Sequence, residues 1–181
     1  MIQHRNLIEC GLNPTKRPIH CFNSFFMEKL TGARTPTPAY CFHGVCRWTR
    51  KINPFECDKI LMPIHVHGNH WTMLVIFVQE KKIGYFDSTG QSGDNEIATV
   101  KKWLQDIAVV QRVAFNAYEW NVVEDQGPCQ TNGVDCGVFA CICAYFISED
   151  LPLEYNQDEM AHYRLKMATD ILRGDFHTNN P

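Results

Sequence analysis

Four side chains in this sequence could together form the site of a thiol nucleophile. Cys136 lies in the run Gln-Thr-Asn-Gly-Val-Asp-Cys-Gly at 130–137, His70 begins an apolar stretch, and Asp87 ends the next one. A thiol nucleophile needs a base that also holds it as a thiolate, a group that orients the base, and donors for a developing oxyanion. His70 fits the first role, Asp87 the second and Gln130 the third.

Two strands must bring the histidine and the aspartate together. The runs 71–78 and 82–86 are typical of strands, and the first is apolar on both faces, as in a central strand. The short turn between them makes them antiparallel partners. His70 at the start of one strand then lies beside Asp87 at the end of the other. A further strand is expected at 59–66.

The nucleophile is expected at the start of a buried helix. The run 136–147 is almost wholly apolar, which is typical of a helix packed inside a domain. At its first turn, unpaired N–H groups and the helix dipole stabilise a thiolate. Gly137 lets a substrate backbone approach, and Gly133 permits a sharp turn before Cys136. A cysteine at a helix start is by itself more often a packing residue, so the prediction rests on its combination with the histidine and the aspartate.

The other expected elements set the fold class. A short helix over 22–30 is closed by Gly32, and an amphipathic helix covers 94–109. A strand is expected at 119–123. A capping box formed by Asn156 and Glu159 opens a last helix, and Gly174 stops it. The order of helix, strands, helix, strand, helix and helix predicts an α+β fold with an antiparallel or mixed sheet.

Composition excludes several classes of protein. The 181 residues are 45% hydrophobic with a net charge of −3, as in one ordinary globular domain. Without clustered basic residues, nucleic-acid binding is not expected, and the longest apolar run, 73–78, is far too short to span a membrane. Nine cysteines, several inside apolar runs, indicate free thiols in a reducing compartment, the nucleus or the cytoplasm. A monomer is expected.

The motifs resemble those of the SUMO-specific (sentrin-specific) ubiquitin-like proteases. That family carries His-Trp, an aromatic-Asp-Ser turn, and Gln-x-Asn-Gly-x-Asp-Cys-Gly. The last motif is highly specific. In this sequence the three are His70-Trp71, Phe86-Asp87-Ser88 and residues 130–137. Supporting likeness is found at 47–51, at Pro63-Ile64-His65, at 139–141 and at 164–172, so the resemblance covers about residues 20–173.

The resemblance implies a papain-like α+β cysteine peptidase, with a buried helix that carries the nucleophile against a mixed or antiparallel central sheet. His70, Asp87 and Cys136 would form the triad. The side chain of Gln130 and the backbone N–H of Cys136 would form the oxyanion hole. Neither a cofactor nor a metal is implied.

The implied activity is that of a thiol peptidase or isopeptidase that cleaves after the C-terminal Gly-Gly of SUMO. It would release SUMO from target lysines and possibly mature its precursor, so SUMO and SUMO-conjugated proteins are the implied partners. Trp71 would cover the narrow tunnel that admits the Gly-Gly tail. Trp48 and His65 are further candidate substrate-binding residues.

Two departures from the family pattern concern the first part of the chain. The family has a Trp-Leu-Asn-Asp-type segment, but no tryptophan occurs here before Trp48, and residues 65–70 are one residue longer than usual. The expected organisation is therefore a divergent or truncated segment at 1–18, a catalytic domain at 19–174 and a flexible tail at 175–181.

Alternative functions stay open at this point. A degraded copy would bind the modifier without cutting it, and an acetyltransferase of the bacterial-effector type has a related fold and runs His, acid and Cys in the same order. His65, His67 and His70 could suggest zinc, but no C-x-x-C pair and no carboxylate within the cluster supports such a site. Packing explains Trp48 as well as contact with a modifier does.

Overall fold

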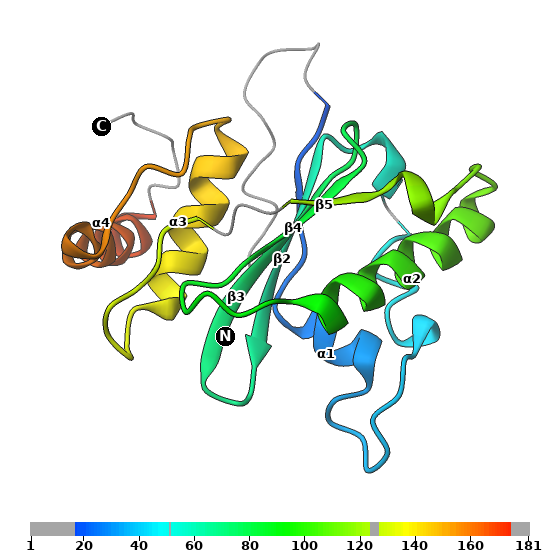
Figure 1. The fold of residues 1–181 in the computed structure, drawn as a ribbon, viewed down its shortest axis with the longest axis horizontal. Helices are drawn as coiled ribbons and strands as arrows, with labels where there is room; N and C mark the ends of the chain where they lie inside the picture. Colours follow the sequence, from blue (N-terminus) through cyan, green and yellow to red (C-terminus); the bar gives the residue numbers. More distant parts are fainter. Residues whose placement is uncertain (1–16, 51, 124–126, 175–181) are drawn as a thin grey trace.

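A mixed five-stranded sheet lies between two groups of helices in the computed structural model, which describes residues 17–50, 52–123 and 127–174 (Figure 1). The strands run in the order β1 to β5 across the sheet. They are β1 (His20–Cys21), β2 (Lys59–Val66), β3 (His70–Phe77), β4 (Lys82–Phe86) and β5 (Asn121–Val123). The β2–β3 and β3–β4 pairs are antiparallel, whereas β1–β2 and β4–β5 are parallel. The expected mixed sheet is confirmed.

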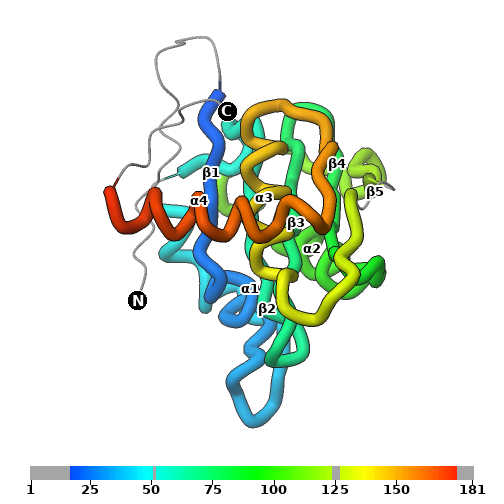
Figure 2. Tube along the Cα trace, turned by 90° about the vertical axis from the view of Figure 1, so that its left-hand side faces the viewer, coloured from blue at the N-terminus to red at the C-terminus, as the bar shows by residue number. Residues whose placement is uncertain are grey.

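Helices cover both faces of this sheet, with α1 and α2 on one side and α3 and α4 on the other (Figure 1). They are α1 (Phe25–Thr31), α2 (Asp94–Gln111), α3 (Cys136–Ser148) and α4 (Met160–Arg173). Four short 3-10 turns are η1 (Phe42–Gly44), η2 (Pro54–Glu56), η3 (Ala117–Glu119) and η4 (Gln157–Glu159). Figure 2 shows α4 crossing in front of α3. The α+β class is confirmed. The expected segments 1–18 and 175–181 lie largely or wholly outside the described residues.

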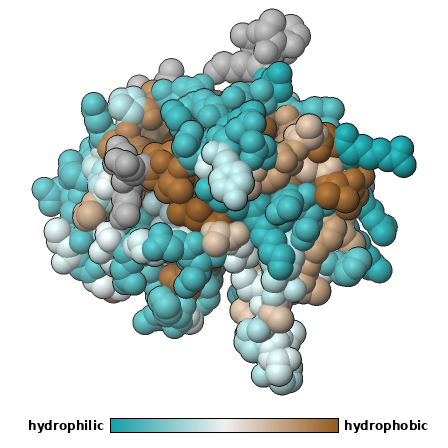
Figure 3. Space-filling model, turned by 45° about the vertical axis from the view of Figure 1, so that its right-hand side comes forward, coloured by the Kyte–Doolittle hydropathy of each residue, from teal (hydrophilic) through white to brown (hydrophobic). Residues whose placement is uncertain are grey.

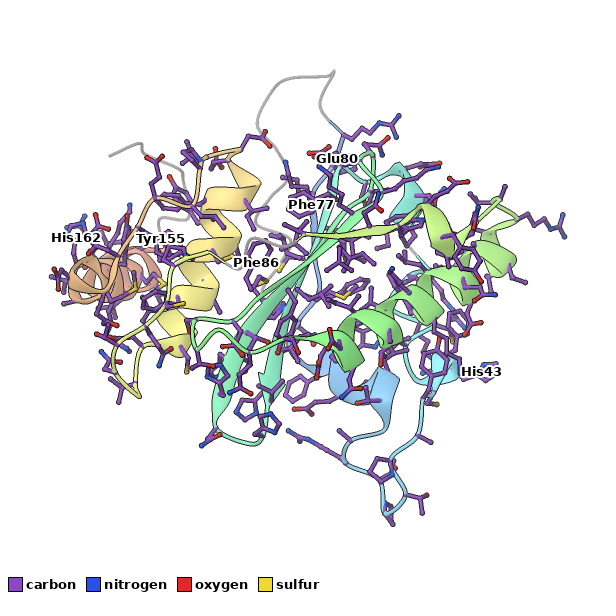
Figure 4. The ribbon with its side chains drawn as sticks, viewed as in Figure 1. His43, Phe77, Glu80, Phe86, Tyr155 and His162 are labelled. Carbon is purple, nitrogen blue, oxygen red and sulfur yellow. The ribbon has the colours of Figure 1, made fainter. Side chains whose placement is uncertain are left out.

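The central strand β3 supplies both hydrophobic cores, because its side chains alternate between the two faces of the sheet. Leu74 and Ile76 pack with α1 and α2, whereas Met73 and Val75 pack with α3. All four are at most 3% exposed. In Figure 4, the labelled Phe86 lies on the α3 side of the sheet. This double burial explains why the strand is apolar on both faces.

Local sequence signals set several boundaries. The capping box of Asn156 and Glu159 is present at η4 and leads into α4, as predicted. Gly32 and Gly174 end their helices in the left-handed conformation, with φ of 61° and 67°. Gly93 precedes α2 where a Cβ would lie 2.2 Å from the Tyr85 ring, so only glycine allows this approach of helix to sheet.

Several expectations differ from the structure. The segment 119–123 divides into η3 and the short strand β5, because only residues 121–123 pair with β4. Cys141 is exposed, although the apolar run around it predicted burial throughout α3. Asp135 stands at the N-cap position of α3, where an aspartate is expected to cap the helix, but it makes no side-chain cap bond there. Its carboxylate is engaged by other side chains, described below.

The surface carries one prominent projection. The loop that follows α1 extends from the body at the bottom of Figure 1 and forms the pale lobe at the bottom of Figure 3. Among the described residues, no helix has the length and apolar character needed to cross a bilayer.

A buried ammonium group ties the sheet to the end of α3. Lys59, at the start of β2, is 6% exposed, and its Nζ donates to Asp58 Oδ2 at 3.0 Å and to Asp150 Oδ1 at 2.5 Å. Asp150 follows α3 in a left-handed conformation with φ of 58°. Burial alone would lower the pKa of Lys59, but the bonds from Asp150 and Asp58 outweigh it, so the pKa is raised.

We expect Lys59→Met to lower the free energy of unfolding by about 1–3 kcal/mol, because two charge-assisted hydrogen bonds are lost. The raised pKa means that the contribution is complete at neutral pH and is lost only as pH rises through that raised value. Urea unfolding at pH 7 measures the change. Lys82→Met is the matched control, because its pair with Glu80 is about half exposed and contributes little. Equal effects of the two substitutions would contradict the prediction.

Candidate active site

The hairpin of β3 and β4 places His70 beside Asp87. Phe77 pairs with Lys82 and Met73 with Phe86, so the start of β3 and the residue after β4 meet at one end of the sheet. His70 Nε2 lies 2.8 Å from Asp87 Oδ1. The sequence predicted this pair, and the structure brings the two residues together.

The surroundings of Asp87 decide which nitrogen of the imidazole carries its proton. The carboxylate is 2% exposed, and the same Oδ1 accepts the backbone N–H and the hydroxyl of Thr89, each at 2.7 Å. An ionised carboxylate only accepts hydrogen bonds, so His70 must donate from Nε2. Nδ1 then keeps its lone pair and can serve as a general base.

Cys136 is the first residue of α3, as predicted, and it lies next to the strand that carries His70. A Cβ built at Gly137 would stand 3.5 Å from Trp71 Cδ1, so the chain neighbours of Cys136 and His70 are in close proximity. Figure 1 shows the start of α3, the start of β3 and the end of β4 at the same end of the molecule. Unpaired N–H groups at this helix start stabilise negative charge on sulfur.

An open pocket of about 630 Å³ is lined in part by Cys136. Its walls come from the start of β3, the loop before α3, the first turn of α3 and one side of α4. They include Asn69, Trp71, Gly133, Cys136, Gly137 and Arg164. Because a Cβ at Gly137 would make only an ordinary contact with Trp71, packing alone does not require glycine there, and the missing side chain leaves room at the thiol. Gly133 does not adopt a positive φ, so the sharp turn expected there is not a backbone requirement.

Gln130 is held from two sides. Its backbone N–H donates to the Ser88 carbonyl at 2.7 Å, and its Oε1 accepts the Ser88 hydroxyl at 2.6 Å. Its Nε2 donates to the carbonyl of Asn132. A primary amide carries two hydrogens, so this bond does not exhaust its donors. The amide therefore has a fixed orientation and a second N–H for an oxyanion.

Asp135, immediately before Cys136, accepts hydrogen bonds from several side chains that the sequence did not predict as its partners. Its carboxylate accepts Asn132 Nδ2 at 2.7 Å, Gln157 Nε2 at 2.8 Å and Arg164 Nη2 at 2.5 Å. The bond from Asn132 and then that from Arg164 hold the pKa of Asp135 below its ordinary value, against the opposing effect of burial. These partners lie 3, 22 and 29 residues away along the chain. The sequence signal related to these contacts is the capping box, which marks the start of α4 but not its contact with Asp135.

The three predicted substrate-binding residues lie in two places. Trp71 is partly buried at the pocket, and its ring centroid is 4.5 Å from that of His65, its partner across the β2–β3 pair. Trp48 instead packs on the side of the sheet that faces α1 and α2, 5.8 Å from the ring of Phe26. The structure thus does not bring Trp48 to Cys136, and its role in binding a modifier stays a prediction.

Comparison with known proteins gives a consistent picture. Residues 4–175 match the Ulp1 protease family, C-terminal catalytic domain. Human sentrin-specific protease 2 is 36% identical over 158 residues, which cover 85% of this chain and 26% of that protein. The ubiquitin-like-specific protease ESD4 of Arabidopsis thaliana is 37% identical over 161 residues, covering 85% of this chain and 32% of that protein. The chain thus spans about a quarter to a third of the length of these relatives.

Solved structures share the fold. The C-terminal Ulp1 protease domain in complex with Smt3, the yeast ortholog of SUMO, superposes with a TM-score of 0.73 and 26% identity, covering 88% of this chain and 70% of that one. The catalytic domain of the Chaetomium thermophilum Ulp1-like SUMO protease superposes with a TM-score of 0.75 and 28% identity, covering 91% of this chain and 64% of that one. The expected papain-like fold is confirmed.

Proposed function

Because this chain belongs to the Ulp1 protease family, we propose that it is a thiol peptidase that cleaves after the C-terminal Gly-Gly of a SUMO-type modifier. The observation that carries the proposal is the His70–Asp87 pair, 2.8 Å apart, at the end of the sheet where Cys136 lines a pocket. The solved yeast relative holds Smt3, an ortholog of SUMO, which supports a modifier of that class as substrate here.

In the proposed reaction, His70 Nδ1 takes the thiol proton and the Cys136 sulfur attacks the carbonyl carbon of the terminal glycine. The negative charge that develops on the carbonyl oxygen is stabilised by the backbone N–H of Cys136 and by the second N–H of Gln130. Protonated His70 then gives its proton to the leaving lysine amine. Water, activated by the same histidine, hydrolyses the thioester and restores the thiol.

The proposed selectivity for glycine follows from the close approach of Trp71 to the start of α3. A substrate chain that reaches the thiol must pass this ring, and Gly137 adds no side chain of its own. Side chains larger than hydrogen at the two terminal substrate positions would clash. SUMO conjugates and the SUMO precursor are therefore the proposed substrates, in the nucleus or the cytoplasm, where cysteines persist in the reduced form.

A SUMO C-terminal probe that carries an electrophile in place of the scissile bond tests this function directly. We expect covalent capture at Cys136, seen as a gain of the mass of SUMO on a gel and located by peptide mass spectrometry. Reversible binding without capture would identify a non-cleaving binding module instead. Absence of both, with acetyl transfer from acetyl-CoA, would identify an acetyltransferase. Either of the last two results would overturn the proposal.

We expect Trp71→Ala to lower kcat/KM for a SUMO conjugate by about 100-fold, because the scissile carbonyl loses the ring that orients it. Alkylation of Cys136 by a small reagent should change little. Trp71→Phe, which keeps a ring, should retain more activity, and Tyr118→Ala removes a 97% exposed aromatic away from the pocket as a control. Unchanged kinetics in Trp71→Ala would exclude this role.

A further inference from the structure

The carboxylate of Asp135 belongs to the residue directly before Cys136, on whose sulfur the proposed reaction forms a second negative charge. Asp135 precedes Cys136 directly, and its side chain is 12% exposed. A carboxylate in this place opposes a thiolate on its neighbour by like-charge repulsion. Its side chain gives no cap bond to α3 that would offset this repulsion.

Arg164 reaches this carboxylate from α4. Its Nη2 donates to Asp135 Oδ1 at 2.5 Å and to the Val134 carbonyl at 3.2 Å. It therefore binds the two residues immediately before the nucleophile, and it also lines the pocket at Cys136. Asn132 and Gln157 hold the other carboxylate oxygen of Asp135, but both are uncharged. Arg164 is thus the group that balances the charge of Asp135.

We propose that Arg164 is a positioning residue for the nucleophile, which neutralises Asp135 and fixes the segment that leads into α3. The proposal rests on the nucleophilic role proposed for Cys136. The other charged or titratable groups at this place are His70 at the start of β3 and Asp87 after β4, and they are paired with each other. The charged groups around this segment therefore form two pairs, His70 with Asp87 and Arg164 with Asp135.

This arrangement predicts shifts of opposite sign from its two members. Without the cation, Asp135 stays ionised beside the sulfur and disfavours the thiolate. Without the carboxylate, Arg164 faces the site alone and favours the thiolate. A purely structural contact would make the two substitutions alike, since each breaks the same bond.

The test is the pH profile of Cys136 alkylation by iodoacetamide, followed site by site with peptide mass spectrometry because the chain has nine cysteines. We expect Arg164→Gln to move the midpoint up by about one pH unit and Asp135→Asn to move it down. For Arg164→Gln, kcat at neutral pH should fall by about tenfold with a smaller change in KM. Arg164→Lys, which keeps the charge, should restore most of the midpoint.

Lys166→Gln is the matched control, because it removes a cation from the same helix whose partner is Asp170, 3.7 Å away and within α4. Its profile should match that of the original protein. Shifts of equal sign in Arg164→Gln and Asp135→Asn, or unmoved profiles with lowered melting temperatures, would overturn the proposal. If Arg164→Gln does not fold, the double variant Arg164→Gln with Asp135→Asn decides, because its midpoint should lie above that of Asp135→Asn alone, and equal midpoints would overturn the proposal. Failure of the proposed function would be seen in a different measurement, as the absence of SUMO probe capture by the original chain.

Discussion

Replacing Cys136 with alanine is expected to abolish turnover of a SUMO conjugate, with a fall in kcat on the order of 10⁶. In the proposed reaction the sulfur forms the thioester, so no other group in the site can take over its step. The fold should tolerate the change, because the buried side chain lines the pocket and loses a single heavy atom. Release of free SUMO from a conjugate, followed on a gel, measures the loss, and circular dichroism verifies the fold.

Two other cysteines of α3 serve as controls. Cys141 is exposed and Cys143 is 2% exposed in the core. Cys141→Ala should leave activity and stability unchanged, whereas Cys143→Ala should cost about 1 kcal/mol of stability without affecting the chemistry. Full activity in Cys136→Ala, or complete loss in either control, would show that the nucleophile is a different residue.

Asp87→Ala is expected to lower kcat on the order of 10⁴. The substitution removes the acceptor of His70 Nε2, so the ring loses both its orientation and its preferred protonation site. Stopped-flow measurement of SUMO release under single-turnover conditions isolates the chemical step. Loss of binding alone, with kcat intact, would contradict an orienting role.

Asp87→Asn separates orientation from charge. His70 and both donors of Thr89 use the same oxygen, Oδ1, and an amide keeps an acceptor in that position. We therefore expect the asparagine variant to keep the tautomer of His70 and to lose much less activity than the alanine variant. The difference in kcat between the asparagine variant and the original chain then measures the effect of the charge alone. Equal losses in the two variants would show that the charge, not the geometry, carries the effect.

The sequence predicted the elements that its local pattern determines. The strands at 59–66 and 82–86 were predicted to the residue, because each is an apolar run followed by turn-forming residues. The strands β1 and β5 were missed or misplaced, because two or three residues carry no period of their own and become strands only by parallel pairing with β2 and β4. Their existence is a tertiary property.

The same distinction applies to the site. The proximity of His70 and Asp87 could be predicted from the sequence because a hairpin joins them. The position of Cys136 could be predicted because the sequence marks the start of a helix there. The contact of Arg164 could not be predicted, because its partner Asp135 lies 29 residues away and the local pattern does not show how α4 packs against the start of α3. Asp135 itself was assigned the local role typical of its position, a helix cap, and long-range partners outcompeted that role.

The separation of the His70–Asp87 hairpin from α3 also sets an order of assembly. Hairpins close in about 1–10 μs, whereas joining distant segments must first overcome a larger loss of chain entropy. During synthesis on the ribosome, β3 and β4 emerge before α3 and α4. A nascent chain could thus pair the proposed base, His70, with Asp87 before Cys136 reaches its place at the start of α3. We therefore expect the proposed peptidase chemistry to begin only after α3 and α4 have docked, so that the alkylation rate of Cys136 would report the completion of folding.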